Sequence, residues 1–259
     1  GCLIVLGGVR IELIPWPWLS VPCSVLWLVL IMNAFNLLDN MDGLAAGIGA
    51  IAAGFCAVHA ARVGQWEATT LAAIVAGGCL GFLRYNVPPA KIFMGDSGSH
   101  LVGLSLAALA LMGSWDHSTQ LLSVLLVPAL VLAVPIFDTC FVTIQRLTHG
   151  QHPFVGGTDH VSHRLAILGL STRQTVLALY GVSALLGCLS IVSANLKPLP
   201  AVALWLSVLT GLVLCGRYLA RVSVYRIERP LGAPVPADLT TPTTLIDTML
   251  LHKRRLVEI

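Results

Sequence analysis

Four polar residues recur at every third position in the stretch NAFNLLDNMDG, between two apolar segments: Asn33, Asn36, Asp39 and Asp42. A straight α-helix turns about 100° per residue, so side chains three residues apart drift around it and cannot form one continuous face. We therefore predict that the helix ends near Asp39 and that Gly43 lets the chain turn. Carboxylates and amides at a bilayer edge are costly unless they face a polar cavity, a metal or each other, so this stretch is a candidate site.

A second polar cluster, RYNVPPAKIFMGDSGS, begins at Arg84 and follows another apolar segment. Its two prolines are expected to end the preceding helix. Ser97 or Ser99 can cap the following helix, whose free N–H groups suit a phosphate. Asp96 suits Mg²⁺, which takes oxygen ligands and typically binds one or two carboxylates together with substrate phosphates. Taken alone, the cluster is equally well interpreted as a capped loop with one solvated aspartate.

The third cluster, HGQHPFVGGTDHVSHR, lies in a connection long enough to indicate a function. His160, His163 and Arg164 suit a diphosphate or a leaving group that needs positive charge. The spacing of the two histidines also suits zinc, although no cysteine or third close ligand supports it. Asp138, inside the preceding apolar segment, either faces the cavity or pairs with Arg146.

Composition indicates a membrane protein. Of the 259 residues 56% are hydrophobic and 10% are charged, and the mean hydropathy is +0.86, whereas a soluble domain carries about 25% charged residues. The net charge of +3 is small and scattered, which argues against nucleic acid as a partner. The cysteines form no CxxC pair and lie in or beside apolar segments, so we expect buried thiols.

The expected fold is all-α and polytopic, with about seven complete transmembrane helices plus one truncated N-terminal helix. Residues 1–9 form the truncated helix, because a span needs about 20 residues. We expect residues 1–221 to form the transmembrane domain, truncated at its N-terminus, and residues 222–259 to form a cytoplasmic tail that could lead into a further span. The expected spans are 21–38, 43–61, 68–84, 98–113, 120–144, 174–194 and 199–219.

Charge predicts the orientation of these spans. Their alternation places the three polar clusters and the tail on one side of the membrane. Every Lys and Arg falls on that side except Arg10, Arg62 and Lys197. By the positive-inside rule this side is cytoplasmic. A site at the cytoplasmic face is therefore predicted.

The stretches NAFNLLDNMDGLAAG, FLRYNVPPAKIFMGDSGSHLVG and DHVSHRL resemble the polyprenyl-phosphate N-acetylhexosamine-1-phosphate transferases, which are related to phospho-N-acetylmuramoyl-pentapeptide transferase. The resemblance covers nearly all of residues 1–220. It implies transfer of a sugar 1-phosphate, expected to be GlcNAc 1-phosphate, from a UDP-N-acetylhexosamine to polyprenyl (undecaprenyl) phosphate, with release of UMP. The implied cofactor is Mg²⁺, with Mn²⁺ as an alternative. The implied location is the bacterial inner membrane, at the first membrane step of cell-envelope glycan synthesis, and a homodimer is left open.

The resemblance also implies roles for individual residues. Asp96 would be a magnesium ligand with Asp39 beside it, Phe93 would lie on or near the uracil, and Lys91 would lie near the phosphates. The residues expected to act in catalysis are Asp39, Asp42, His160, His163 and Arg164, and those expected to bind substrate are Asn33, Asn36, Asn86, Lys91 and Phe93.

Three departures from the family pattern stand out. Asn40 occupies the position of the family's usual glycine, and the usual HxHH loop here has Ser162 between Val161 and His163. An aspartate pair that the family carries on an earlier cytoplasmic loop has no counterpart in this sequence. The fragment is therefore expected to be inactive or weakly active without that pair.

Three alternatives remain. The muramoyl-pentapeptide branch of the family normally carries adjacent histidines in its loop, which this loop lacks. A transporter would place polar groups near mid-span on paired discontinuous helices. The third alternative is a non-catalytic fragment of a longer protein.

Overall fold

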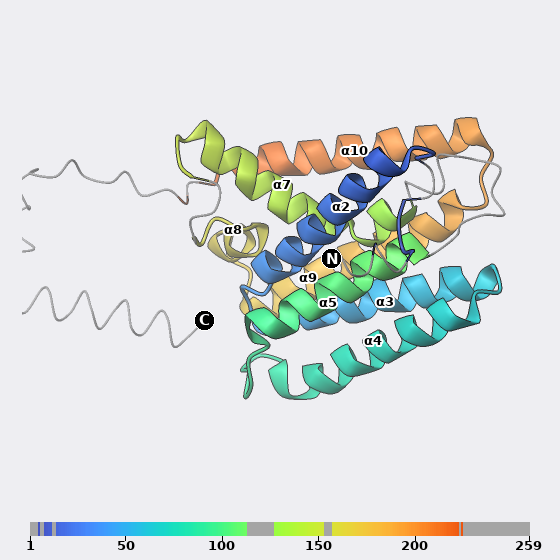
Figure 1. Ribbon diagram of the computed structural model, residues 1–259. Coiled ribbons are helices and arrows are strands. Elements are labelled where there is room, and N and C mark those ends of the chain that lie inside the picture. Colours follow the sequence, from blue (N-terminus) through green and yellow to red (C-terminus); the bar gives the residue numbers. More distant parts are fainter. Residues whose placement is uncertain are drawn as a thin grey trace, which may run out of the picture. The chain divides into compact units, whose positions relative to one another are not determined.

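A computed structural model describes residues 14–112, 127–152 and 157–222, together with 5, 8–11 and 224. All regular structure in these residues is helical, as predicted, and none of them lies in a strand. The helices are α2 (Pro17–Leu38), α3 (Leu44–Arg62), α4 (Trp66–Asn86), α5 (Gly95–Met112), α7 (Ala133–Thr148), α8 (Val161–Ile167), α9 (Thr172–Ser193) and α10 (Pro198–Ala220) (Figure 1).

Five of the described helices are long and apolar enough to cross a membrane: α2, α3, α4, α9 and α10. The protein is therefore a multi-pass membrane protein. The predicted count of seven spans is not confirmed, because α5 and α7 are not among the five. The predicted truncated helix and the predicted tail lie almost wholly outside the described residues, so both stay predictions.

The ends of α2 and α3 lie where the local sequence predicts them. α2 ends at Leu38, and Asp39 leaves the helical conformation. Gly43 then adopts a φ of +79°, a left-handed conformation that glycine reaches without steric cost, and α3 starts at the next residue. Similarly, α4 ends at Asn86, directly before the segment that contains the two prolines. The capping prediction was wrong, since α5 already starts at Gly95 and both Ser97 and Ser99 lie inside it.

The predicted span 120–144 is interrupted. Residues 127–131 are helical, the chain makes a turn at Leu132, and α7 starts at Ala133. Pro135 supplies the physical reason, because it has no N–H to donate back to the preceding turn and its ring crowds that turn. α7 also continues to Thr148, four residues beyond the predicted end.

The helices pack closely where small residues allow it. α3 packs against α4 and α9, while α2 packs against α5 and α7. Gly103 of α5 lies so close to α2 that an added Cβ atom would come within 2.8 Å of the Met32 Cα. This close approach holds the first turn of α5 beside the last turns of α2.

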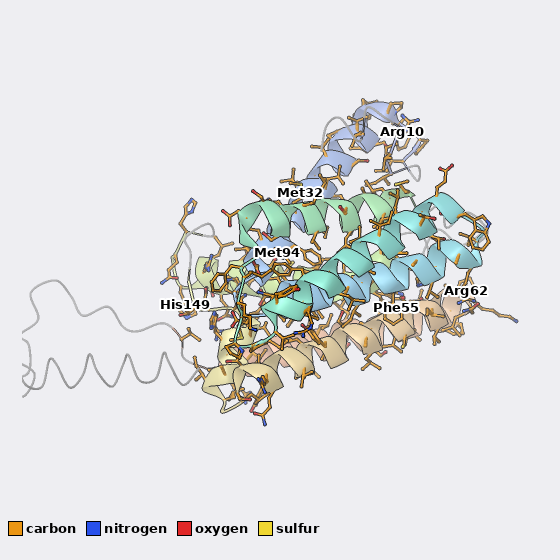
Figure 2. The ribbon with its side chains drawn as sticks, turned by 90° about the horizontal axis from the view of Figure 1, so that it is seen from below. Arg10, Met32, Phe55, Arg62, Met94 and His149 are labelled. Carbon is orange, nitrogen blue, oxygen red and sulfur yellow. The ribbon has the colours of Figure 1, made fainter. Side chains whose placement is uncertain are left out.

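One end of the bundle collects the polar segments. Figure 1 shows that α2 ends, α5 begins and α8 lies at the same end of the helices. In Figure 2, Met94 and His149 lie toward this end and Arg62 lies at the opposite one. The three polar clusters of the sequence therefore share one end of the fold, as their alternation along the chain predicts.

Candidate active site

The first two polar clusters meet through the amide of Asn36. Its Nδ2 donates to Asp96 Oδ1 and to Ser99 Oγ, at 3.1 Å in both cases. Asn36 lies one turn before the end of α2, and Asp96 lies in the first turn of α5. Asp96 is exposed, so its carboxylate can still reach a ligand outside the protein.

A second set of bonds ties the loop after α2 to the proline-containing loop. Asp42 Oδ2 accepts from the Ala90 N–H at 2.9 Å. Asn86 is buried and uses both ends of its amide, accepting from the Gly43 N–H at 2.8 Å and donating to the Ile92 carbonyl at 2.9 Å. Asn86 therefore braces two loops of the site, whereas its predicted contact with substrate stays a prediction.

The three aspartates of this region share one electrostatic environment. The pKa of Asp39 is raised, first by its burial and then by the negative charges of Asp42 and Asp96. The carboxylates of Asp42 and Asp96 are thus near enough to Asp39 to gather negative charge in this region. A hard cation suits such a place.

The carboxylates of Asp96 and Asp39 offer oxygen atoms, which are the ligands that Mg²⁺ takes. Among the residues that the structure describes, no three His, Cys, Asp or Glu side chains come together as a metal-holding group. Mg²⁺ typically binds one or two carboxylates plus substrate phosphates and keeps several waters, so it needs no such group. Asp96 and Asp39 are the residues that would hold it.

The remaining predicted substrate-binding residues lie on the surface of this end. Lys91 is exposed, and Phe93 is 80% exposed, which is unusual for a large apolar ring and leaves its face open for a planar ligand. Asn33 is also exposed, but its Nδ2 donates to the Val29 carbonyl of its own helix at 2.7 Å. Lys91 and Phe93 are therefore accessible to a ligand, whereas the amide nitrogen of Asn33 already donates a hydrogen bond within its own helix.

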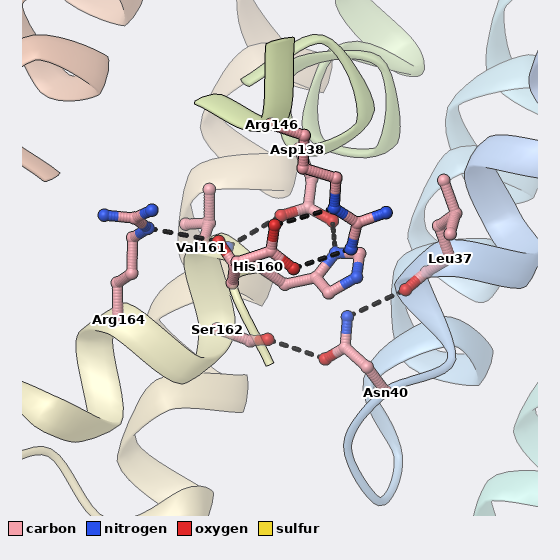
Figure 3. A network of polar contacts seen from close by, with 9 residues as sticks. Leu37, Asn40, Asp138, Arg146, His160, Val161, Ser162 and Arg164 are labelled. Carbon is pink, nitrogen blue, oxygen red and sulfur yellow. Dashed lines mark hydrogen bonds and ion pairs between the residues drawn. The ribbon is translucent and has the colours of Figure 1, made fainter. Parts of the chain in front are cut away.

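The histidine loop is organised by Asp138, for which the sequence left two interpretations open. Asp138 lies in α7 and is buried. Its Oδ2 lies 2.8 Å from His160 Nδ1, and its Oδ1 accepts from the Val161 N–H at 2.8 Å, at the start of α8 (Figure 3). The partner of Asp138 is therefore His160 and not Arg146.

Arg146 instead forms an ion pair with Asp159. Its Nε and one terminal nitrogen lie 2.7 and 2.6 Å from the two carboxylate oxygens, and both residues are buried. Burial alone would raise the pKa of Asp159, but the hydrogen bonds and the positive charge of Arg146 lower it. This pair was not predicted from the sequence, although the sequence does contain a basic residue near the end of an apolar helix and an acidic residue in the following loop.

Arg164 of the third cluster is buried beside the end of α10. Its guanidinium is buried, lies 5.0 Å from the centre of the Phe141 ring, and donates to the carbonyls of Leu219 and Val222 at 3.0 and 2.7 Å. The last carbonyl groups of a helix have no hydrogen-bond donor within the helix, and Arg164 provides such a donor at the end of α10. Arg164 therefore joins α8 to the end of α10, and its predicted contact with a diphosphate stays a prediction.

The first and third clusters meet at two of the positions that depart from the family pattern. Ser162 Oγ donates to Asn40 Oδ1 at 2.6 Å, and Asn40 Nδ2 donates to the Leu37 carbonyl at 2.8 Å (Figure 3). His163 follows on α8 and is only partly buried. Its pKa is lowered, mainly by its burial. The loop after α2 therefore contacts both other clusters.

Two apolar cavities extend from this end of the fold. One, of about 730 Å³, lies between α7 and α10 and includes Gln145 and Arg217 in its lining. The other, of about 190 Å³, is lined by residues that include Leu38 and Ser162. Phe137 and Leu212 line both cavities, so the apolar lining is continuous from the cleft between α7 and α10 to the last residue of α2.

Comparison with known proteins identifies relatives of this chain. Residues 3–114 match the sequence profile of glycosyl transferase family 4. The chain is 42% identical over 190 residues to the probable undecaprenyl-phosphate N-acetylglucosaminyl 1-phosphate transferase of Bacillus subtilis (strain 168), covering 73% of this chain and 51% of that protein.

Two further relatives represent other activities. The decaprenyl-phosphate N-acetylglucosaminephosphotransferase of Mycobacterium leprae (strain TN) is 37% identical over 204 residues, covering 71% of this chain and 51% of the relative. The phospho-N-acetylmuramoyl-pentapeptide-transferase of Acetivibrio thermocellus is 35% identical over 184 residues, covering 70% of this chain and 52% of the relative. The chain thus spans about half the length of the curated relatives that it matches.

Proposed function

We propose that this protein, whose residues 3–114 match glycosyl transferase family 4, transfers GlcNAc 1-phosphate from UDP-GlcNAc to a polyprenyl phosphate. An oxygen of the lipid phosphate bonds to the phosphorus that carries the sugar. The bond from that phosphorus to the bridging oxygen breaks, and UMP leaves with the bridging oxygen. The products are a polyprenyl diphosphate sugar and UMP.

One observation carries this proposal. The end of α2 and the loop after it are hydrogen-bonded to both other polar clusters, through Asn36 to Asp96 and through Asn40 to Ser162. Segments 60 and 122 residues apart in the chain therefore meet at one end of an apolar bundle. A reaction between a water-soluble nucleotide sugar and a membrane lipid needs such a polar site at the end of membrane helices.

The region around Asp39, Asp42 and Asp96 is suited to a reaction in which two negatively charged phosphates must come together. Two phosphates that approach each other repel, and a divalent ion held by Asp96 and Asp39 would supply the neutralising charge. Asn36 holds the Asp96 carboxylate from one side, which limits its rotation. Asp42 fixes the neighbouring loop through the Ala90 N–H. Lys91 and Phe93, both exposed at this end, are the proposed contacts for the phosphates and the uracil.

The apolar cavity between α7 and α10 suits the lipid tail. Its lining is almost entirely apolar, and its volume of about 730 Å³ takes a stretch of polyprenyl chain. Arg217 and Gln145 in its lining provide polar partners for the lipid phosphate. The continuity of this lining with the cavity beside Ser162 supports entry of the lipid from this side.

The same proposal includes the topology. The described spans, together with the regions around α5 and α7, would give the seven predicted crossings. The positive charge of the polar end supports a cytoplasmic site. Labelling of the loops from each side of the membrane tests the number of crossings and the side on which the site lies.

Two alternatives are less well supported. The N-acetylglucosamine-transferring relatives are 42% and 37% identical to this chain, compared with 35% for the muramoyl-pentapeptide relative. A transporter would need its polar groups near mid-span, whereas here the three clusters share one end of the helices.

The test measures UMP release by membranes that contain the full-length gene product. The assay supplies UDP-GlcNAc, undecaprenyl phosphate and Mg²⁺, and each is omitted in turn. We expect UMP release that requires all three and that EDTA abolishes. Release with UDP-MurNAc-pentapeptide but not with UDP-GlcNAc would overturn the choice of donor, and no release with any UDP-sugar would overturn the proposed function.

A further inference from the structure

We propose that Asp138 is a positioning residue, which holds the His160 ring so that its Nε2 atom faces the reacting phosphates. No role was predicted for Asp138 in catalysis. The inference about the reaction rests on the proposed function, whereas the inference about the histidine ring can be tested without it.

The first step is the environment of the pair. Asp138 and His160 are each 3% exposed. A buried carboxylate inside a largely apolar helix is costly unless its oxygens are paired. Both oxygens of Asp138 are paired, one with His160 Nδ1 and one with the Val161 N–H, each at 2.8 Å. The carboxylate therefore has a defined orientation.

The second step concerns α8. His160 occupies the N-cap position of this helix, and its side chain makes no capping bond there. Asp138, from another helix, accepts from the Val161 N–H in the first turn of α8 and replaces the missing cap. The same carboxylate thus fixes the start of the helix and the ring of the residue before it.

The third step is the direction of the ring. Asp138 occupies Nδ1, and the described residues provide no hydrogen-bond partner for Nε2. Two residues further on, Ser162 bonds to Asn40, which directly follows Asp39. In Figure 3 the His160 ring lies between Asp138 and the segment that carries Leu37 and Asn40. Nε2 is therefore the ring atom left for a ligand at the end of α2.

The fourth step is the chemistry. A carboxylate at Nδ1 accepts the ring proton there, so Nε2 of the neutral ring carries a lone pair. That lone pair takes the proton of the lipid phosphate as the phosphate oxygen bonds to the sugar-bearing phosphorus. The proton then passes to a phosphate oxygen of the departing UMP, and the ring returns to its starting tautomer.

The variant Asp138→Asn separates orientation from packing. Asparagine has nearly the same size and can still accept from the Val161 N–H. Its amide, however, donates to Nδ1, which places the ring proton on Nε2 and removes the lone pair needed there. In the Ser-His-Asp triad this type of exchange leaves the geometry intact and lowers kcat about 10⁴-fold.

We would record ¹⁵N spectra of histidine-labelled protein and kcat for UMP release by the full-length gene product. In the wild-type spectrum we expect His160 to carry its proton on Nδ1, and in Asp138→Asn on Nε2. His160→Asn assigns the signal, and His163→Asn is the matched control that leaves the His160 tautomer unchanged. We expect kcat to fall at least about 100-fold in Asp138→Asn, with little change in the KM for UDP-GlcNAc.

Two further comparisons decide the proposal. Asp138→Asn should lower kcat no further when His160 is already Asn, because the carboxylate acts through the ring. An additive loss in that background overturns the proposal, as does a wild-type His160 with its proton on Nε2. If the wild type releases no UMP with any UDP-sugar, the proposed function fails, and the spectra still decide whether Asp138 sets the tautomer.

Discussion

Two groups of acidic residues lie at the same end of the fold and differ in how the protein treats them. The aspartate region comprises Asp39, Asp42 and Asp96, and the histidine region contains Asp138 and Asp159. Asp138 and Asp159 are both buried, and each is paired within 2.8 Å, Asp159 with the Arg146 guanidinium and Asp138 with the His160 ring. In the aspartate region, Asp96 is exposed and its carboxylate receives the uncharged amide of Asn36 at 3.1 Å.

The pKa directions express the same difference. Arg146 lowers the pKa of Asp159 despite its burial, whereas burial and two neighbouring carboxylates raise the pKa of Asp39. Asp159, whose charge Arg146 neutralises, supports the structure, whereas a carboxylate that has no cationic partner among the described residues can hold an external cation. The two regions therefore differ in which carboxylates remain available to bind a ligand, and four experiments test this difference.

The largest expected effect is on activity in the aspartate region. Asp96→Asn removes the exposed charge proposed to hold Mg²⁺, so kcat/KM for UMP release should fall about 10³-fold. The free energy of unfolding should stay within about 0.5 kcal/mol of the wild type, because the residue is exposed. If Asp96→Asn keeps full activity, the exposed carboxylate of Asp96 is not needed for the reaction.

The opposite result is expected for the buried ion pair. Arg146→Met leaves the Asp159 carboxylate buried without its partner, which costs about 3–5 kcal/mol of unfolding free energy. Unfolding in mixed detergent micelles measures this loss. The double variant Arg146→Met/Asp159→Leu should recover most of it, because an apolar pair replaces the ion pair. A single variant as stable as the wild type would contradict the structural role of the histidine region.

The raised pKa of Asp39 predicts how Mg²⁺ dependence changes with pH. Proton and cation compete for the same carboxylate, and a raised pKa means that the proton is held to a higher pH than an ordinary aspartate would hold it. The Mg²⁺ concentration for half-maximal activity should therefore rise as pH falls through the raised pKa of Asp39, by about tenfold per unit at the steepest.

Asp42→Asn provides the matched control for this pH dependence. It removes one of the two neighbouring charges that raise the pKa of Asp39, while its amide oxygen can still accept from the Ala90 N–H. In this variant we expect the pH at which the Mg²⁺ requirement begins to rise to be lower than in the wild type. If this pH is the same in both proteins, the charge of Asp42 does not affect the carboxyl group of Asp39.

The smallest expected effect concerns the contact between the two regions. Ser162→Ala removes the donor to Asn40 and should lower kcat/KM about threefold to tenfold, which corresponds to a hydrogen bond of about 1 kcal/mol. Asn40→Ala should lower it further, because the Leu37 carbonyl also loses its partner. In a double-mutant cycle we expect a coupling of about 0.5–1.5 kcal/mol, and a coupling of zero would mean that the two regions act independently.

Local features of the site were predictable because they depend on neighbouring residues. The end of α2 before Asp39, the turn at Gly43 and the end of α4 at Asn86 follow from polar spacing, glycine and proline. The start of α5 was misplaced, since a serine can serve either as a cap or inside the first turns. α8 was not predicted, because its seven residues are too few to show a periodic pattern.

Hydropathy, charge and motif spacing are properties of the chain, so the sequence alone was enough to predict a helical membrane protein, its resemblance to a transferase family and the grouping of its polar clusters at one end of the helices. The hydrogen-bond partners of the polar side chains, in contrast, became known only from the packing of the helices. Asp138 lies 22 residues from His160, and Ser162 lies 122 residues from Asn40. Whether a polar side chain is neutralised or left open to a ligand depends on distances and burial that arise only when distant helices pack together.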